Sequence, residues 1–488
     1  MKDKFFLAGD FIDIQYVWIL PFLFNYLKYK NINSIITEKN LPNRVIKNKN
    51  LKKYINYEFR ILDKSFLITK FLSIFFIFKY LPILLKILFI KKNDLLDRKN
   101  NFLEMQIFHS FWDMNNLKVN EQTLKVPLIS KFKSFLIIIL TICKAENLLL
   151  NNIKIALVGH NVYSKKTLSA ILVHKNVTVI SQANFNFHIQ NKYLEKTWDW
   201  PNKKFYQKHL LNISDHKING FWNKRLKGLG DYEDSNKALK SEFKIKKNID
   251  YPKNLIMLHI FRDSPFISID KKRIFCDYFH WIDVTLDIIK NSDEKWVIRP
   301  HPSAKRWGED QSSIIKNIFS KKFGSKIPKN IFFDTRKISN TDLFKRCNKL
   351  VTYSGTSHLE VGCFGVKSII ISETSASRID KFLFHKPKNI ANYKKLLLEE
   401  KLNIFKLNSS QSNLCKKILY IRENYFSMRR EVKGKYIYRG DKENIRDKDY
   451  KLSMANFENY EKYLLKLGSI FEKEINHTVS SKFINEYE

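Results

Sequence analysis

The chain has 488 residues, of which 44% are hydrophobic and 28% charged, and Lys and Arg outnumber Asp and Glu by 87 to 48. This apolar content excludes a mainly disordered chain, and 13 Gly and 11 Pro are too few for collagen-like or low-complexity sequence. The length predicts two or three domains. Because Gly and Pro are scarce, we expect each one to occur where the backbone conformation requires it.

The formal charge of +39 is spread evenly along the chain. Residues 1–150 carry 24 Lys or Arg and 12 Asp or Glu, and the resulting net charge is close to that expected for a stretch of this length if the charge is spread evenly. Nucleic-acid-binding proteins usually concentrate basic residues on one face or arm, so the pattern does not favour a nucleic-acid partner. It favours anionic partners such as nucleotide phosphates or the cytoplasmic face of a bilayer.

The first residues have a short basic start, but Asp10 and Asp13 interrupt the apolar run that follows, which is not typical of a secretory signal. Five cysteines without a CxxC pair predict neither a disulfide framework nor a zinc site. We therefore expect a cytoplasmic protein without a metal site that can also lie peripherally on the cytoplasmic face of the inner membrane.

Short β-rich apolar runs alternate with helical patterns, which predicts parallel sheets with crossover helices. The predicted strands of a first set are Lys4–Gly9, Ser34–Thr37, Lys154–Gly159 and Val177–Ser181. Those of a second set are Leu255–Phe261, Trp296–Arg299, Ile331–Phe333, Leu350–Ser354 and Ser368–Ser372, with helices at Tyr278–Lys290 and Asn340–Arg346. A lysine-rich stretch at 238–253 is typical of an interdomain linker.

These sets predict an α/β fold with two Rossmann-like domains and a C-terminal helical tail. We expect an N-terminal domain at 1–245, a second domain at 246–400, and a tail at 401–488 that packs back on the domains and holds a last helix near Met454–Glu474.

The segment from Phe66 to Ile90 is apolar but contains Lys70, Lys79 and Lys86, so a spanning helix would have to bury Lys79 near the bilayer centre. The lysine spacing favours an amphipathic helix. A long core helix whose lysine face reaches solvent is the favoured interpretation, and interfacial contact with a membrane is the alternative.

In open α/β sheets, ligands bind outside the carboxyl ends of the strands, so the residues that end each strand are the candidates for a site. The first candidate is WVIRPHPSAKRW, where Pro300 and Pro302 hold His301 in an extended turn after a strand. With Arg299 and Lys305 nearby, His301 suits a phosphate or carboxylate ligand. A structural turn is the alternative.

The second candidate is LVTYSGTSHLEVGCFG, in which a strand ends at Ser354, Gly355, Thr356 and Ser357 and a helix follows. Gly355 lets the backbone approach a ligand closely, and the amides and hydroxyls that follow suit an anion. Glu360, one turn into the helix, suits a pair of sugar hydroxyls. The sequence has neither a Walker loop nor GxGxxG, which disfavours ATP hydrolysis and nicotinamide binding.

Further candidates end other strands. His259 and Asp263 follow the first strand of the second domain. In the first domain, Gly159 and His160 end one strand, and Gly9 and Asp10 end another. A His or Asp at such a position can act as general base on an acceptor hydroxyl, with His160 our first choice and Asp10 the second.

The segments HIFRDSP, FCDYFHWIDVTLDIIK, RPHP and SGTSHLEVGCFGVKSIII, in this order over residues 254–375, resemble the bacterial capsule polysaccharide biosynthesis proteins, which are GT-B glycosyltransferase-like. The resemblance implies that His301 and residues 354–357 hold the phosphate of a donor nucleotide and that Glu360 holds its ribose or sugar. It also implies catalysis without a metal or another cofactor.

The resemblance implies a glycosyltransferase that moves a sugar from a CMP- or UDP-linked donor to a surface or capsular polysaccharide or a lipid-linked acceptor. In this interpretation the second domain binds the donor and the first binds the acceptor. Alternatives are a sugar-nucleotide epimerase of the same architecture, a non-catalytic polyanion or nucleotide-sugar binder, and a CDP-glycerol-type phosphotransferase.

Overall fold

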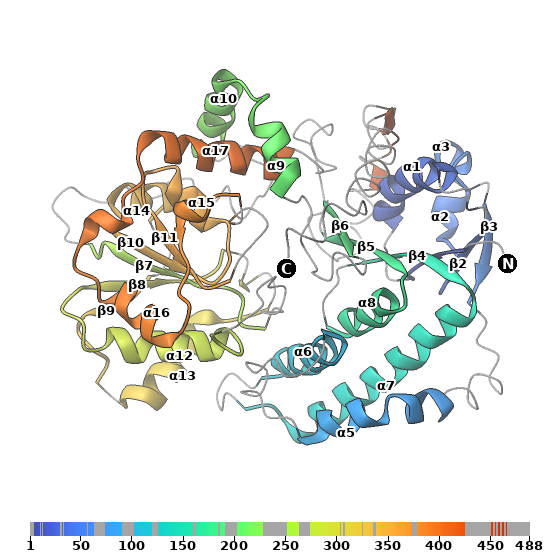
Figure 1. Ribbon diagram of the computed structural model, residues 1–488, viewed down its shortest axis with the longest axis horizontal. Helices are drawn as coiled ribbons and strands as arrows, with labels where there is room; N and C mark the ends of the chain where they lie inside the picture. The colour runs from blue at the N-terminus through green and yellow to red at the C-terminus, as the bar shows by residue number, and fades with distance from the viewer. Residues whose placement is uncertain are drawn as a thin grey trace.

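The computed structural model describes two parallel sheets, each covered by helices on both faces (Figure 1). The described residues are 4–9, 11, 13–29, 32, 34–55, 57–62, 74–89, 102–119, 125–159, 163–183, 186–190, 203–227, 251–262, 274–302, 304–305, 308–324, 326–334, 338–372, 377, 379–424 and single positions or pairs between 450 and 465. Most of the predicted linker at 238–253, and most of the last predicted helix, lie outside them.

The first sheet has the order β3-β2-β1-β4-β5-β6, in which only the β5–β6 pair is antiparallel. Its strands are β1 (Lys4–Leu7), β2 (Ser34–Thr37), β3 (Glu58–Ile61), β4 (Ile153–Val158), β5 (Thr178–Ala183) and β6 (Asn186–Gln190). The central strands are apolar on both sides because helices cover both faces, as parallel sheets require.

Two groups of helices flank this sheet (Figure 1). On one face lie α1 (Asp13–Tyr29), α2 (Asn43–Ile46) and α3 (Lys49–Lys52); on the other lie α6 (Phe102–Asn116), α7 (Leu128–Leu150) and α8 (Ser164–His174), with α5 (Leu81–Phe89) outside them. No helix among the described residues is both long and apolar enough to cross a bilayer.

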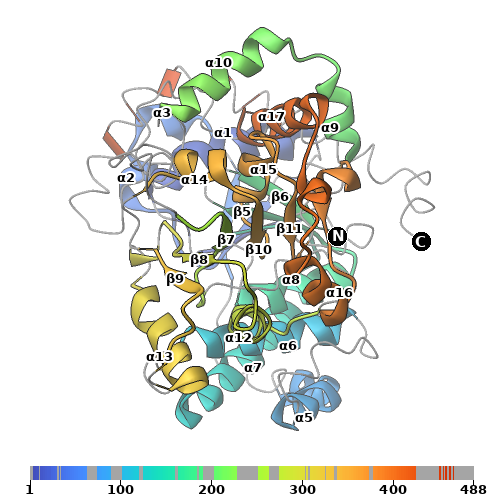
Figure 2. The same cartoon turned by 90° about the vertical axis from the view of Figure 1, so that its left-hand side faces the viewer.

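The second sheet is parallel throughout and has the order β12-β11-β10-β7-β8-β9. Its strands are β7 (Asn254–Met257), β8 (Trp296–Arg299), β9 (Ile331–Phe333), β10 (Lys349–Thr352), β11 (Ser368–Ile370) and β12 (Phe384–His385). Figure 2 shows α12 (Tyr278–Ile289), α13 (Gln311–Phe323) and α16 (Ile390–Leu397) on one face, and α14 (Asn340–Arg346), α15 (Ser357–Gly362) and α17 (Ser409–Asn424) on the other.

Both sheets have Rossmann-like strand order, so the predicted α/β class with two Rossmann-like domains is confirmed. β8, β9 and α14 have the predicted bounds. The strand predicted to run from Leu255 to Phe261 ends at Met257. Beyond it, the amides of Phe261 and Arg262 donate to the Glu309 carboxylate instead of to a neighbouring strand.

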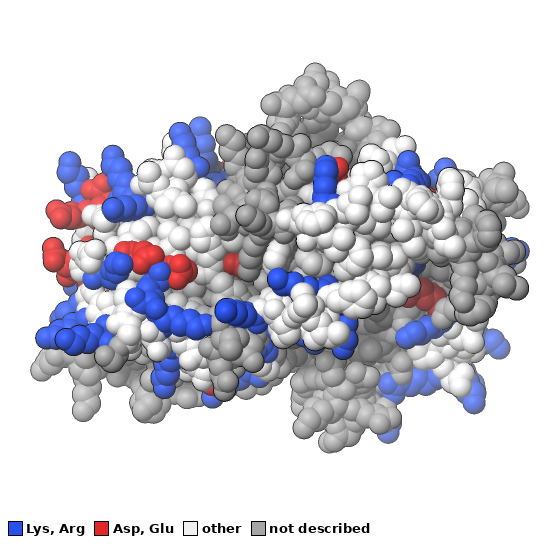
Figure 3. Space-filling model, turned by 90° about the horizontal axis from the view of Figure 1, so that it is seen from below, with Lys and Arg blue, Asp and Glu red and all other residues white. Residues whose placement is uncertain are grey.

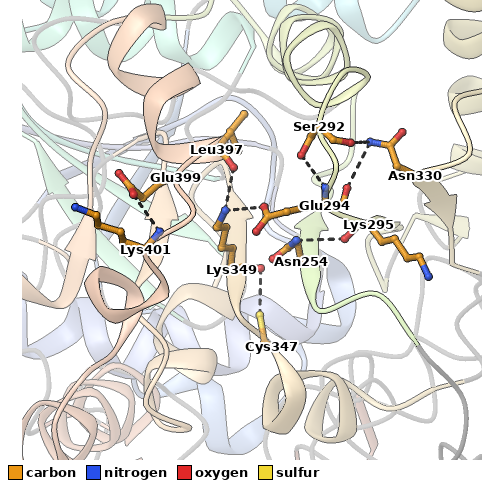
Figure 4. A network of polar contacts seen from close by, with 10 residues as sticks. All are labelled: Asn254, Ser292, Glu294, Lys295, Asn330, Cys347, Lys349, Leu397, Glu399 and Lys401. Atoms are coloured by element: carbon orange, nitrogen blue, oxygen red, sulfur yellow. Dashed lines mark hydrogen bonds and ion pairs between the residues drawn. The ribbon is translucent and has the colours of Figure 1, made fainter.

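A polar network closes the amino-terminal edge of the second sheet (Figure 4). Lys349, fully buried at the start of β10, donates from Nζ to Glu294 Oε2 at 2.6 Å and to the Leu397 carbonyl at 3.2 Å. Asn254, at the start of β7, donates to the Lys295 carbonyl at 3.2 Å. This edge is therefore structural, and the carboxyl-terminal edge is the one available to a ligand.

Each domain is covered in part by a segment from the other end of the chain. Helices α9 (Lys203–Leu210) and α10 (Asp215–Leu226), which we expected in the first domain, pack against α17 beside the second sheet (Figure 1). There Trp222 contacts the Phe364 ring at a centroid distance of 5.6 Å, and buried Arg225 forms an ion pair with buried Glu360 of α15.

The described positions after 450 pack on the first domain. The Tyr450 hydroxyl donates to the Arg44 carbonyl at 3.2 Å, and the Arg44 guanidinium lies over the Tyr450 ring at 4.8 Å. Glu461 pairs with Lys53 at 2.5 Å, and Asn25 donates to the Leu465 carbonyl at 2.9 Å. These contacts tie the two domains together through their exchanged segments.

Removing one charge of the Arg225–Glu360 pair leaves the other buried and uncompensated. We expect Glu360→Gln to lower the free energy of unfolding by about 3–5 kcal/mol, measured by urea unfolding. The double variant R225M/E360L should lose less than this single variant. Asp287→Asn, which removes an exposed carboxylate paired with Lys290 and Lys322, is the control and should lose under about 1 kcal/mol. A Glu360→Gln loss as small as the control's would contradict this account.

Candidate active site at the facing sheet edges

The strand order of the second sheet reverses between β7 and β10, which pair with each other. The connections after these two strands leave toward opposite faces (Figure 2), and α/β proteins bind ligands in the crevice outside the carboxyl ends of the strands at such a switch point. His259 follows β7 and Ser354 follows β10, so the structure brings together two predicted site residues that lie 95 positions apart.

His259 supports the turn that follows β10. Its Nε2 accepts a hydrogen bond from the Ser354 amide at 3.2 Å and lies 3.5 Å from Thr352 Oγ1, and its ring stacks on Tyr278 at 5.0 Å. Burial lowers the pKa of His259 to about 4, so the ring is neutral at pH 7 and carries its proton on Nδ1. A Cβ at Gly355 would lie 3.3 Å from Nε2, so this turn needs glycine to pack so closely.

His301 is joined to the same group by Gln311, the first residue of α13. The His301 amide donates to Gln311 Oε1 at 2.6 Å, while Gln311 Nε2 donates to the His259 carbonyl at 2.6 Å. As a result the rings of His259 and His301 lie 6.2 Å apart between centroids. His301 is half-buried, and Lys305 in the next turn is exposed.

Glu309 fixes the loop after β7. Its carboxylate is buried and accepts from the amides of Phe261 and Arg262, each at 3.0 Å, and from Gln311 Nε2 at 2.6 Å. Burial raises the pKa of Glu309, although these hydrogen bonds oppose that shift. We call Glu309 and Gln311 the loop clamp. Sequence reasoning missed it; the available signal was a run of polar residues, GEDQ, directly before a helix.

Ser354, Gly355, Thr356 and Ser357 form the half-buried turn between β10 and α15. Two histidines support the turn. His259 accepts from the Ser354 amide, and His358 Nδ1 hydrogen-bonds the Gly355 carbonyl. Burial lowers the pKa of His358 to about 3, so this ring is also neutral. His301 and the turn that begins at Ser354 are therefore joined through His259.

Arg299 and Glu360 are placed differently from the rest of the predicted donor-binding set. Arg299 is buried; it forms an ion pair with Asp334 and donates to the Ile338 carbonyl at 2.7 Å. Glu360 is held by Arg225. Each charge is thus compensated within the protein, as a buried charge must be, rather than directed at the group around His301.

Asp10, His160 and Asp263 lie outside the described residues. The glycines that precede the first two, Gly9 and Gly159, are described. They follow β1 and β4, between which the order of the first sheet reverses. The Gly9 amide donates to Glu38 Oε2 at 3.1 Å, and a Cβ at Gly9 would lie 2.9 Å from the Glu38 Cβ. Glu38, which also pairs with Lys144, is a carboxylate at this edge that sequence reasoning missed.

The carboxyl-terminal edges of the two sheets face each other. The Tyr163 hydroxyl, after β4, donates to the Arg262 carbonyl, after β7, at 3.4 Å. Arg262 Nη2 in turn donates to the Val119 carbonyl beyond α6, also at 3.4 Å. Tyr163 has φ 53°, a conformation that favours glycine, which is strain of the kind that clusters at functional sites. The points at which the strand order of each sheet reverses, which we call the switch points, therefore face each other across one interface.

Among the described residues, no group of three or more His, Cys, Asp and Glu side chains is arranged to hold a metal ion. The five cysteines form no disulfide.

Comparison with known proteins gives similarity in architecture only. No protein-family model and no curated sequence matches the chain. Similar solved structures include a UDP-GlcNAc 2-epimerase of Methanocaldococcus jannaschii in complex with UDP-GlcNAc and UDP (TM-score 0.27, 12% identity, 86% of this chain and 99% of that one). Others are KpsC, a β-Kdo 2,4-transferase of Thermosulfurimonas dismutans (0.32, 9%, 55% and 79%), and a glycosyltransferase of Rickettsia africae (0.25, 12%, 97% and 98%). Similarities this low carry no conclusion about activity.

The neutral state of His259 makes the fold sensitive to acid. Below about pH 6.5 the unfolded chain binds a proton on this ring that the folded protein does not bind until about pH 4. Its contribution to stability is therefore complete above pH 6.5 and falls by about 1.4 kcal/mol per pH unit between these values.

His259→Gln keeps an acceptor for the Ser354 amide but does not titrate. We expect the stability difference between wild type and this variant to shift in favour of the variant by about 1.4 kcal/mol per unit as the pH falls from about 6.5 to 4, measured by urea unfolding. A pH-independent difference would show that the ring is not held neutral.

Proposed function

We propose that this chain is a glycosyltransferase that transfers a sugar from a CMP- or UDP-linked donor to a surface or capsular polysaccharide or a lipid-linked acceptor. One observation carries the proposal: polar groups that follow β7, β8 and β10 gather at the switch point of the second sheet, and this point faces the switch point of the first. Such an arrangement suits two substrates held on opposite sides of one crevice.

The second domain would bind the donor. His301 and the hydroxyls and amides of the 354–357 turn would contact its phosphate, and Gly355 would admit that phosphate close to the backbone. Lys305, exposed beside His301, would supply further positive charge. Negative charge grows on the departing nucleotide in the transition state, so groups that are fixed beforehand by His259 and the loop clamp stabilise it without having to reorganise.

Arg299 and Glu360 would support this site rather than contact the donor. Arg299 connects the end of β8 to Asp334 after β9, and Glu360 connects α15 to α10. Each pairing fixes an element next to a proposed donor-binding turn: β8 leads to His301, and α15 begins at Ser357, the last residue of the 354–357 turn.

The first domain would bind the acceptor and supply the general base. His160 remains our first choice and Asp10 the second, because they follow β4 and β1 at the switch point of the first sheet. Transfer requires a base within hydrogen-bond reach of the acceptor hydroxyl.

His301→Ala tests the donor site. The backbone amide that bonds Gln311 is retained, so we expect the melting temperature to stay within about 2 °C while transfer falls by at least about 100-fold, measured with radiolabelled nucleotide sugar. His174→Ala removes an exposed histidine at the far end of α8 and should leave transfer unchanged. Wild-type-like turnover by His301→Ala would remove the argument for this site.

A thermal-shift screen with CMP and UDP tests nucleotide binding independently of turnover, since a ligand of the folded state raises its stability. We expect one of the two to stabilise wild type and to lose its effect in His301→Ala. Stabilisation by neither would contradict the proposal. If product forms without any acceptor, the protein is an epimerase and not a transferase.

A further inference from the structure

A large apolar surface covers one side of the first domain, remote from the crevice. Of the 22 large hydrophobic side chains that are exposed among the described residues, 13 lie within 74–89 and 128–140. They belong to α5, the helical turns before it and the first half of α7, and they are between 37% and 81% exposed. We call this surface the apolar face.

The apolar face is not the outer side of an ordinary amphipathic helix. Phe76, Tyr80, Leu84 and Ile87 are buried against the domain, and their spacing places them on one side of the helix. The opposite side carries Phe75, Phe78, Leu85, Leu88 and Phe89 instead of polar residues. A helix that is apolar on all sides is normally covered on all sides, and an exposed apolar surface of this kind marks an interaction site.

The segment is anchored firmly to the protein despite its exposed outer side. Lys79 and Tyr80 both donate to buried Glu146 of α7, each at 2.7 Å, and Lys86 pairs with Glu104 of α6 at 3.0 Å. The helix that we predicted to lie in the core thus lies on the surface. Its lysines pair with carboxylates of the protein, and its solvent-exposed side also carries apolar residues.

Charge identifies the partner. Lys79 and Lys86 remain 39% and 51% exposed after pairing, and exposed Lys133 lies on the α7 half. Among the described residues, the carboxylates that pair with these lysines, Glu104 and Glu146, are largely buried within the protein. Figure 3 shows basic side chains at the edges of an uncharged surface over α5 and α7. An apolar surface with a cationic border is complementary to anionic lipid headgroups above acyl chains.

A second copy of the chain fits this face less well. A two-fold dimer would bring the same surface of each copy together and oppose the lysines of one with those of the other. The excess charge of the chain, +39, adds to that repulsion. A lipid surface instead neutralises the lysines, and their aliphatic stems can lie along it while the ammonium groups meet phosphates.

We propose that the apolar face, residues 74–89 and 128–140, docks the protein on an anionic bilayer surface. α5 and the first half of α7 lie along the same border of the domain in Figure 1, so both can sink into the headgroup region. This docking is independent of the proposed sugar transfer, and each can fail without the other.

The test is co-sedimentation of the full chain with vesicles of phosphatidylcholine alone or with about 30% phosphatidylglycerol. Phe89→Ser with Leu128→Ser removes two of the most exposed side chains of the face without changing charge. We expect wild type to bind the anionic vesicles and this variant to bind at least about 10-fold more weakly. Leu211→Ser with Phe382→Ser, which removes two exposed apolar side chains elsewhere, is the matched control and should bind like wild type.

A second variant tests the role of charge. Lys86→Gln with Lys133→Gln should weaken binding to anionic vesicles but leave binding to neutral vesicles unchanged. Failure of wild type to bind anionic vesicles, or equal binding by F89S/L128S, would overturn the proposal. So would light scattering that shows a dimer which F89S/L128S dissociates, because the face would then be an interface between copies.

Discussion

The crevice of the second domain depends on how one buried carboxylate is satisfied. Glu309 accepts from two backbone amides after β7 and from Gln311, and the nearby Arg262 cation also favours its charged form. Because an uncompensated buried carboxylate is unstable, the loop must keep the conformation that brings these donors to it. Gln311 extends the same constraint to His301 and to the His259 carbonyl. The relative positions of the two histidines follow from this one requirement.

Sequence reasoning recovered the parts of the fold that local pattern determines. Buried parallel strands are continuous apolar runs, so β8 and β9 were predicted with their observed bounds. The strands β3, β6 and β12 were missed, because they lie at sheet edges or are only two residues long, where composition is not distinctive. The expected domain bounds of 1–245 include α9 and α10, but sequence pattern does not indicate which sheet a helix will cover.

The sequence indicated polar residues at strand ends, some of which the fold brings together because strand order determines which ends meet. Whether they form a site stays a prediction. Partner choice was not predictable: Arg299 and Asp334 are 35 residues apart, and Arg225 and Glu360 are 135 apart. A charged residue that binds a ligand and one that is paired inside the protein look alike in sequence, and only the fold distinguishes them.

The exchange of segments between the domains affects how the chain is made. Asn48 of the first domain bonds Tyr450, about 400 positions later in the chain. At about 5–20 residues per second, the ribosome needs about 20–80 s to synthesise that interval. Until then the side of the first domain beside α1 and α3 lacks its covering segment, so the domain that is made first is the one completed last. Nascent chains of this protein should therefore be substrates for chaperones that shield apolar surface during translation.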